Sequence, residues 1–278
     1  MTYKNLLVYL DDRAGCAARL AMAIELARAH DAHLTGLYVA ADPILTGGLQ
    51  VEVPAQFLAS IEEQIVRRAQ AVIAQFTETV EKSGLTADSR TVRCPASQIP
   101  EIVSLHARYA DLAILGQPEP GSVADDDGHL AESVVLSSGR PALVVPYIGA
   151  GTRLGRRVLV AWDAEREAAR AVNDALPLLQ RAEKVTVLVI GPHQGDHGPE
   201  PGADIALHLA RHGVPAEAQH LAIGDLSVAN ALLSRLVDLD IDLLVMGAYG
   251  HSRLREWILG GVTREIFQQM TVPVLMSH

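Results

Sequence analysis

The sequence has 278 residues, of which 49% are hydrophobic and 20% are charged, a balance that excludes a disordered chain. Acidic residues outnumber basic ones by 33 to 23, and the formal charge of −10 argues against binding along a nucleic-acid backbone. Two cysteines, Cys16 and Cys94, exclude a disulfide framework. No run of 18 apolar residues and no signal-peptide pattern is present. We expect a cytoplasmic protein without a membrane segment, in two domains of roughly 100–200 residues each.

Apolar strands alternate with helices from one end of the sequence to the other. In the first half, strands are predicted at 6–10, 33–40, 86–94, 111–116 and 141–146, and helices at 14–30, 54–83, 98–109 and 129–138. In the second half, strands are predicted at 158–162, 185–190, 216–222, 242–247 and 272–277, and helices at 165–181, 203–212, 226–238 and 253–270. Continuous apolar strands alternating with helices indicate parallel sheets that helices cover on both faces.

The two halves repeat one pattern, which indicates a duplication. Three aligned pairs are NLLVYLDD (5–12) with RVLVAWDA (157–164), ADLAILG (110–116) with IDLLVMG (241–247), and RPALVVPY (140–147) with VPVLMSH (272–278). The alignment places Asp11 opposite Asp163 and Gly116 opposite Gly247. Between the halves lies the glycine-rich segment 147–155, and a Gly/Pro-rich loop is predicted at 191–202.

A glycine-rich segment follows the predicted strand 242–247. Its glycines are Gly247, Gly250, Gly260 and Gly261, and Thr263 follows them. Ligands of open α/β sheets bind beyond the carboxyl ends of the strands, where glycines let backbone N–H groups approach an anion. The start of the next helix also favours phosphate. The segment therefore predicts a phosphate-binding site, to which the Thr263 hydroxyl would add a donor.

The spacing Gly247-x2-Gly250-x9-Gly260 resembles the G-x2-G-x9-G-S/T motif of the ATP-binding universal stress proteins, and so do the surrounding MGAYGHSRLREWILGGVT and the later VPVLM. The resemblance implies two tandem Rossmann-like domains, of the adenine nucleotide alpha hydrolase-like type, over 1–148 and 155–278. Each would be a five-stranded parallel sheet with helices on both faces, and the two would pair through their last strands.

The resemblance also implies a ligand and its site. The ligand is ATP, or the ADP or AMP derived from it, with Mg²⁺ as a candidate companion. The binding residues that the resemblance implies are Asp163, Ile190, Gly247, Gly250, Gly260, Gly261 and Val262. Met246, His251, Arg253 and Thr263 are further candidates within and beside the motif. Gly261 departs from the family pattern, which has Ser or Thr there, so a backbone N–H is kept and a hydroxyl is lost.

The first half does not keep the motif. Glu119 stands where Gly250 would be, and Asp125, Asp126 and Asp127 precede Gly128, which aligns with Gly260. At an effective dielectric near 20, each carboxylate about 4 Å from a phosphate charge costs roughly 4 kcal/mol. We therefore expect a degenerate first half and one nucleotide per chain.

Fast phosphoryl transfer is not expected from this sequence. The three lysines, Lys4, Lys82 and Lys184, lie outside the motif, and no G-x4-G-K-S/T is present. Arg253 could contact phosphate or be an ordinary solvated charge on a helix. His251 could lie near the phosphate or form a hydrogen bond within the loop. We expect nucleotide binding with little or no hydrolysis, in a stress-response module that an unknown protein partner recognises.

Other functions stay open or are set aside. Asp163 could face the nucleotide or cap the next helix. A receiver domain would need an Asp near 90–95 and a Lys near 141–147, and neither is present. His208 and His212 share a helix face without an evident third ligand, so no metal site is predicted. The competing hypotheses are an interaction protein with vestigial nucleotide sites and a slow ATPase, and the sequence does not decide whether the chain forms a homodimer.

Overall fold

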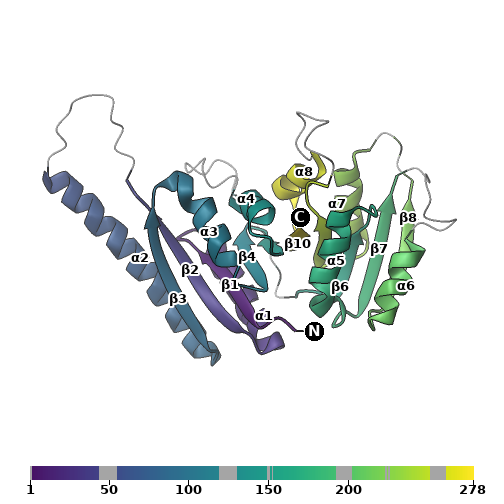
Figure 1. Cartoon of the computed structure of the whole chain (residues 1–278), viewed down its shortest axis with the longest axis horizontal. Helices are drawn as coiled ribbons and strands as arrows, with labels where there is room; N and C mark the ends of the chain where they lie inside the picture. Colours follow the sequence, from purple (N-terminus) through teal and green to yellow (C-terminus); the bar gives the residue numbers. More distant parts are fainter. Residues whose placement is uncertain are drawn as a thin grey trace.

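Ten strands form one sheet in the computed structural model of the chain, and helices lie on both sides of it (Figure 1). The described residues are 2–43, 55–118, 130–148, 151, 153–191, 202–222, 224, 226–250 and 261–278. The strand order is β3-β2-β1-β4-β5-β10-β9-β6-β7-β8. None of the helices among these residues combines the length and apolar character that crossing a bilayer requires.

The first half contributes the first five strands of that order. Its elements are β1 (Asn5–Leu10), α1 (Gly15–His30), β2 (His33–Ala41), α2 (Ala55–Ser83), β3 (Ala87–Cys94), the 3-10 turn η1 (Ala96–Gln98), α3 (Ile99–Ala107), β4 (Leu112–Gly116), α4 (Leu130–Ser137) and β5 (Ala142–Val145). Neighbouring strands within this half are parallel.

The second half repeats the arrangement in the same chain order. Its elements are β6 (Arg157–Ala161), α5 (Arg166–Leu179), β7 (Lys184–Ile190), α6 (Ala203–Arg211), β8 (Ala216–Leu221), α7 (Val228–Asp238), β9 (Leu243–Gly247), α8 (Gly261–Gln269) and β10 (Val274–Ser277). Its strands are parallel to one another as well. The predicted fold class, two five-stranded parallel sheets in tandem with helices on both faces, is confirmed.

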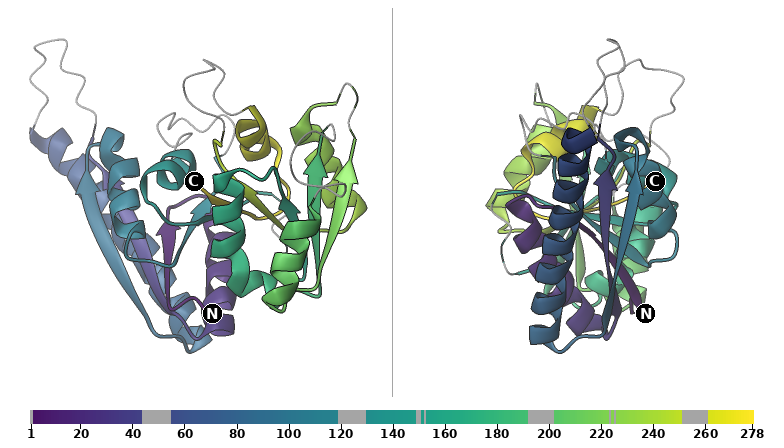
Figure 2. Two further views of the ribbon diagram at one scale, coloured as in Figure 1. Left: turned by 45° about the vertical axis from the view of Figure 1, so that its right-hand side comes forward. Right: turned by 90° about the vertical axis from the view of Figure 1, so that its left-hand side faces the viewer.

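Two apolar layers bury the sheet, one on each face. They lie between the sheet and the helices that Figure 2 shows on its two sides. Successive residues of β1 point to opposite layers. Leu6 and Val8 belong to the layer that α1, α2, α5 and α6 cover, whereas Leu7 and Tyr9 belong to the layer that α3, α4, α7 and α8 cover. Because a strand's side chains alternate between faces, a strand that is apolar at every position needs helices on both sides. The helix that follows β6 and the helix that follows β9 therefore cover opposite faces.

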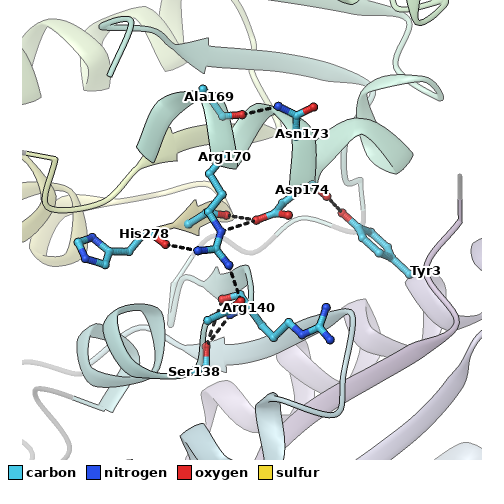
Figure 3. A network of polar contacts seen from close by, with 10 residues as sticks. Tyr3, Ser138, Arg140, Ala169, Arg170, Asn173, Asp174 and His278 are labelled. Carbon is cyan, nitrogen blue, oxygen red and sulfur yellow. Dashed lines mark hydrogen bonds and ion pairs between the residues drawn. The ribbon is translucent and has the colours of Figure 1, made fainter. Parts of the chain in front are cut away.

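The halves join edge to edge through β5 and β10. These two strands are antiparallel, with Leu143 opposite Leu275, which confirms the predicted pairing of the closing strands. A polar network adds to the junction (Figure 3). Arg170 of α5 donates to the carbonyl oxygens of His278, at 2.8 Å, and Gly139, at 2.5 Å. The Tyr3 hydroxyl donates to the carbonyl oxygen of Asp174 at 2.7 Å. Helix α5 of the second half is thus hydrogen-bonded to the segment before β5 and to the segment before β1 of the first half.

The described element ends lie within about two residues of their predicted positions. The helix expected at 98–109 is α3, which begins at Ile99, directly after η1, and ends two residues early at Ala107. Pro100 lies in the first turn of α3, where a helix does not use the backbone N–H. Several predictions lie partly or wholly outside the described residues. They include most of the loop 191–202, the first eight residues of the helix expected at 253–270, and the first-half residues Glu119, Asp125, Asp126, Asp127 and Gly128.

Candidate functional site

The carboxyl ends of three adjacent strands bring predicted site residues of the second half to one edge. Asp163 follows β6, Ile190 ends β7 and Gly247 ends β9, and the strand order there is β9-β6-β7. Strand β6 has β7, the next strand along the chain, on one side and β9 on the other. Helix α5, which follows β6, and helix α8, which follows β9, cover opposite faces of the sheet. This is the point of an open α/β sheet at which a crevice for a ligand forms.

The first two motif glycines pack closely against the start of α5. A Cβ placed on Gly247 would lie 2.6 Å from the backbone nitrogen of Ala168 and 2.7 Å from the carbonyl carbon of Glu167. A Cβ on Gly250 would lie 3.1 Å from Oε2 of Glu167. Gly247 is therefore required by backbone packing, whereas the space beside Gly250 is bounded by a carboxylate.

Glu167 was not among the predicted site residues, and it is the most unusual group at this edge. Its side chain is 3% exposed, although it belongs to the first turn of α5. Oε1 accepts a hydrogen bond from Nε of Arg166, whose side chain is 84% exposed. Oε2 has no hydrogen-bond partner among the described residues. A buried carboxylate oxygen without a partner costs free energy, so this position calls for a functional explanation.

Asp163 is exposed, and its Oδ1 accepts from the backbone nitrogen of Glu165 at 3.0 Å. The side chain thus closes the turn that leads into α5, but it does not cap the helix, whose N-cap residue is Glu165. The next residue, Ala164, has a positive φ of 64°, a conformation that residues other than glycine seldom adopt. The turn therefore holds Asp163 at the strand end while leaving its Oδ2 toward solvent.

The remaining predicted residues divide by burial. Met246 (5% exposed) and Thr263 (4%) are buried, Ile190 and Val262 are partly buried in the α7–α8 layer, and Gly261 is exposed. Thr263 is therefore on the buried face of α8, whereas the sequence predicted that its hydroxyl would donate to the phosphate. His251, Arg253 and Gly260 lie outside the described residues.

Tyr249, between Gly247 and Gly250, contacts the other half of the chain. Burial, and next its hydrogen bond to Glu132 of α4, raise the pKa of its hydroxyl well above the usual range. Its φ of 59° is also positive. No local sequence pattern predicts this contact, because Glu132 lies more than a hundred residues away along the chain.

The equivalent edge of the first half holds a cation. Arg19 is 3% exposed; its Nε donates to the carbonyl oxygen of Tyr9 and its Nη2 pairs with Oδ2 of Asp11, both at 2.8 Å. A Cβ on Gly116 would lie 2.2 Å from Arg19 Nη1. A cavity of about 20 Å³ remains beside these residues, which is room for about one water molecule. Asp11 is therefore paired with a buried cation, whereas the hydrogen bond of Asp163 is to the backbone of Glu165.

Within the described residues, no three His, Cys, Asp or Glu side chains are placed to hold an ion. The rings of His208 and His212 have centroids 4.7 Å apart, and they form a ring contact on α6.

Comparison with known proteins agrees with the geometry. Two tandem Rossmann-like units, with a glycine-rich turn at a strand end of the second, define the class of protein. A model of the universal stress protein family matches residues 2–146 and 155–278, so the chain belongs to the universal stress protein family.

Two kinds of relative support this assignment. The universal stress protein Slr1230 of Synechocystis sp. is 28% identical over 173 residues, which are 59% of this chain and 57% of that protein. The chain therefore aligns with little more than half of that relative. A universal stress protein structure from Archaeoglobus fulgidus superposes with a TM-score of 0.74 at 16% identity, covering 98% of this chain and 95% of that one. A functionally unknown protein from Pseudomonas aeruginosa gives 0.57 at 14% identity, covering 99% and 92%.

Proposed function

We propose that the second half binds one adenine nucleotide, ATP or the ADP or AMP derived from it, with little or no hydrolysis. The observation that carries the proposal is the position of Gly247 and Gly250 at the strand end next to Asp163. Glycines at this point leave backbone N–H groups open to phosphate, and an exposed carboxylate on the neighbouring strand suits a ribose hydroxyl. The domains would span 1–148 and 155–278.

The first half is proposed to be a structural partner without a nucleotide. Arg19 fills the space under Gly116 and neutralises Asp11, so the two groups that the second half offers to a ligand are used within the protein. One nucleotide per chain follows. The chain would then act in the cytoplasm as a nucleotide-dependent stress-response module, whose state a protein partner reads.

The test is mass spectrometry of nucleotide released from the denatured, purified protein, together with ATP binding by calorimetry. We expect about one adenine nucleotide per chain, and loss of binding in Gly250→Val. Gly151→Val is the matched control, because Gly151 is exposed and a Cβ there would approach nothing closer than 3.9 Å. No nucleotide in the protein and no binding of added ATP would instead favour an interaction protein with vestigial sites.

Slow hydrolysis is a separate question that one assay answers. Single-turnover measurement with excess protein, with and without Mg²⁺, should give a rate no faster than uncatalysed hydrolysis. A faster rate that Gly250→Val abolishes would make the second half a slow ATPase.

A further inference from the structure

We propose that Glu167 is the protein's ligand for a divalent cation that binds together with the phosphate groups of the nucleotide. The inference rests on the proposed function and adds to it the reason why this site would require a metal ion. It starts from the buried carboxylate oxygen that has no partner among the described residues.

The position of Glu167 relative to the glycines is the first step. Its Cβ and carbonyl carbon lie against Gly247, and its Oε2 lies on the side of Gly250. A phosphate that accepts hydrogen bonds from the backbone around Gly250 would therefore lie near a carboxylate. Two negative groups at such a distance repel each other strongly when they are shielded from water.

The second step is that no described residue forms a hydrogen bond or an ion pair with this oxygen. Arg166 is the ion-pair partner, but its Nε engages Oε1 and its side chain is 84% exposed. An exposed guanidinium is screened by solvent. Oε2 faces the glycines with its lone pairs unused among the described residues.

A divalent cation would bind the unpartnered Oε2 of Glu167 and would also remove its repulsion from the phosphate. Mg²⁺ is usually held by one or two carboxylates together with phosphate oxygens and water. A single protein carboxylate is therefore enough when a nucleotide supplies the other ligands, and this agrees with the absence of a three-residue metal cluster among the described residues. The cation would also turn the repulsion between Glu167 and phosphate into attraction.

The first half provides an internal contrast. The repeat places Gly15 opposite Glu167 and Ala171 opposite Arg19. Under Gly116 the first half has a guanidinium that donates hydrogen bonds to Tyr9 and Asp11. Under Gly247 the second half has a carboxylate with one oxygen hydrogen-bonded and the other without a partner among the described residues. In the first half the charges of Arg19 and Asp11 compensate each other, whereas in the second half Oε2 of Glu167 is open to a bound cation.

The experiment measures ATP affinity by calorimetry in MgCl₂ and in EDTA, for the wild-type chain and Glu167→Gln. In MgCl₂ the variant should bind at least about tenfold more weakly than wild type, and in EDTA it should bind as well as wild type or better. The variant keeps the shape of Glu167, and Glu165→Gln is the control because it removes the same charge from an exposed residue of the same turn. The control should change affinity by less than about threefold.

Mn²⁺ offers a second readout that does not depend on the variant's folding. Electron paramagnetic resonance of the wild-type chain should show one tightly bound Mn²⁺ per bound ATP, with more Mn²⁺ retained than ATP alone retains at the same concentration. If ATP binds and Glu167→Gln keeps the wild-type affinity in MgCl₂, the metal role of Glu167 is overturned while the proposed function stands. If ATP binds under no condition, the proposed function fails, and this inference fails with it.

Discussion

The hydroxyl of Tyr249 is hydrogen-bonded to Glu132, so the glycine segment of the second half is held by helix α4 of the first. Tyr249 lies between two of the motif glycines and has a φ of 59°. Because this conformation is unfavourable for a residue with a side chain, contacts of the side chain must maintain it. The degenerate half therefore has a structural part in shaping the candidate site of its neighbour.

Removing this hydrogen bond should weaken nucleotide binding and stability together. We expect Tyr249→Phe to lower the free energy of unfolding by about 1.5–3 kcal/mol, as for a hydrogen bond to a charged group, and to lower ATP affinity several-fold. Urea unfolding and calorimetry measure the two effects. Tyr109→Phe is the control, since Tyr109 is 76% exposed.

A double-mutant cycle tests the pairing itself. If Tyr249→Phe and Glu132→Gln act through one contact, their combined effect on unfolding should be smaller than the sum of the single effects by about 0.5 kcal/mol or more. Additive effects would mean that the two side chains stabilise the protein independently.

Periodicity and repetition predicted the layers of this fold, because they follow from local pattern. The apolar runs at 6–10 and 158–162 are buried on both faces, and the pairing of β5 with β10 follows from the need to cover two sheet edges. The contact of Tyr249 with Glu132 depends on how the halves join, and no local spacing encodes it.

The burial of Glu167 could not be read from its position either. An acidic residue in the first turn of a helix normally complements the helix dipole at the surface. Here the close approach of Gly247 to Glu167 and Ala168 covers the turn and buries the side chain. The available signal was the repeat alignment, in which Glu167 and Ala171 face Gly15 and Arg19 of the first half.

Gly247 should be intolerant of any side chain. Gly247→Ala places a Cβ 2.6 Å from a backbone nitrogen, and backbone cannot move aside as a flexible side chain does. We expect a loss of about 1–3 kcal/mol in the free energy of unfolding, as for overpacking, measured by urea denaturation. Gly151→Ala should stay within about 0.5 kcal/mol of wild type. An equal, small effect at both positions would contradict the close packing of Gly247 on α5.

Arg170 should be irreplaceable by lysine at the junction of the halves. Its guanidinium reaches the carbonyl oxygens of His278 and Gly139, and its Nε lies 3.7 Å from Asp174. A lysine has one nitrogen and cannot span these acceptors. Arg170→Lys should lower the free energy of unfolding by about 1–2 kcal/mol, whereas Arg211→Lys, at an exposed position, should not. Equal stability of the two variants would contradict the bridging role.

His30 should make the fold sensitive to mild acid. Its side chain is 3% exposed, and neither ring nitrogen has a hydrogen-bond partner among the described residues. Burial, and next the charges of Arg181 and Lys4, lower the pKa of the imidazole below its usual value. The unfolded chain therefore takes up the proton first as the pH falls, and stability is lost below an unfolded pKa of about 6.5 until the folded pKa is reached.

The pH slope of stability separates His30 from the other ten histidines. Between pH 7.5 and pH 6.5 the wild type and His30→Leu should lose stability in parallel. Below about pH 6.5 the wild type should fall more steeply, by up to about 1.4 kcal/mol for each pH unit, while His30→Leu lacks this component. His212→Gln, at an exposed position, should follow the wild type. Identical slopes for the wild type and His30→Leu would show that His30 is protonated as readily in the folded chain as in the unfolded one.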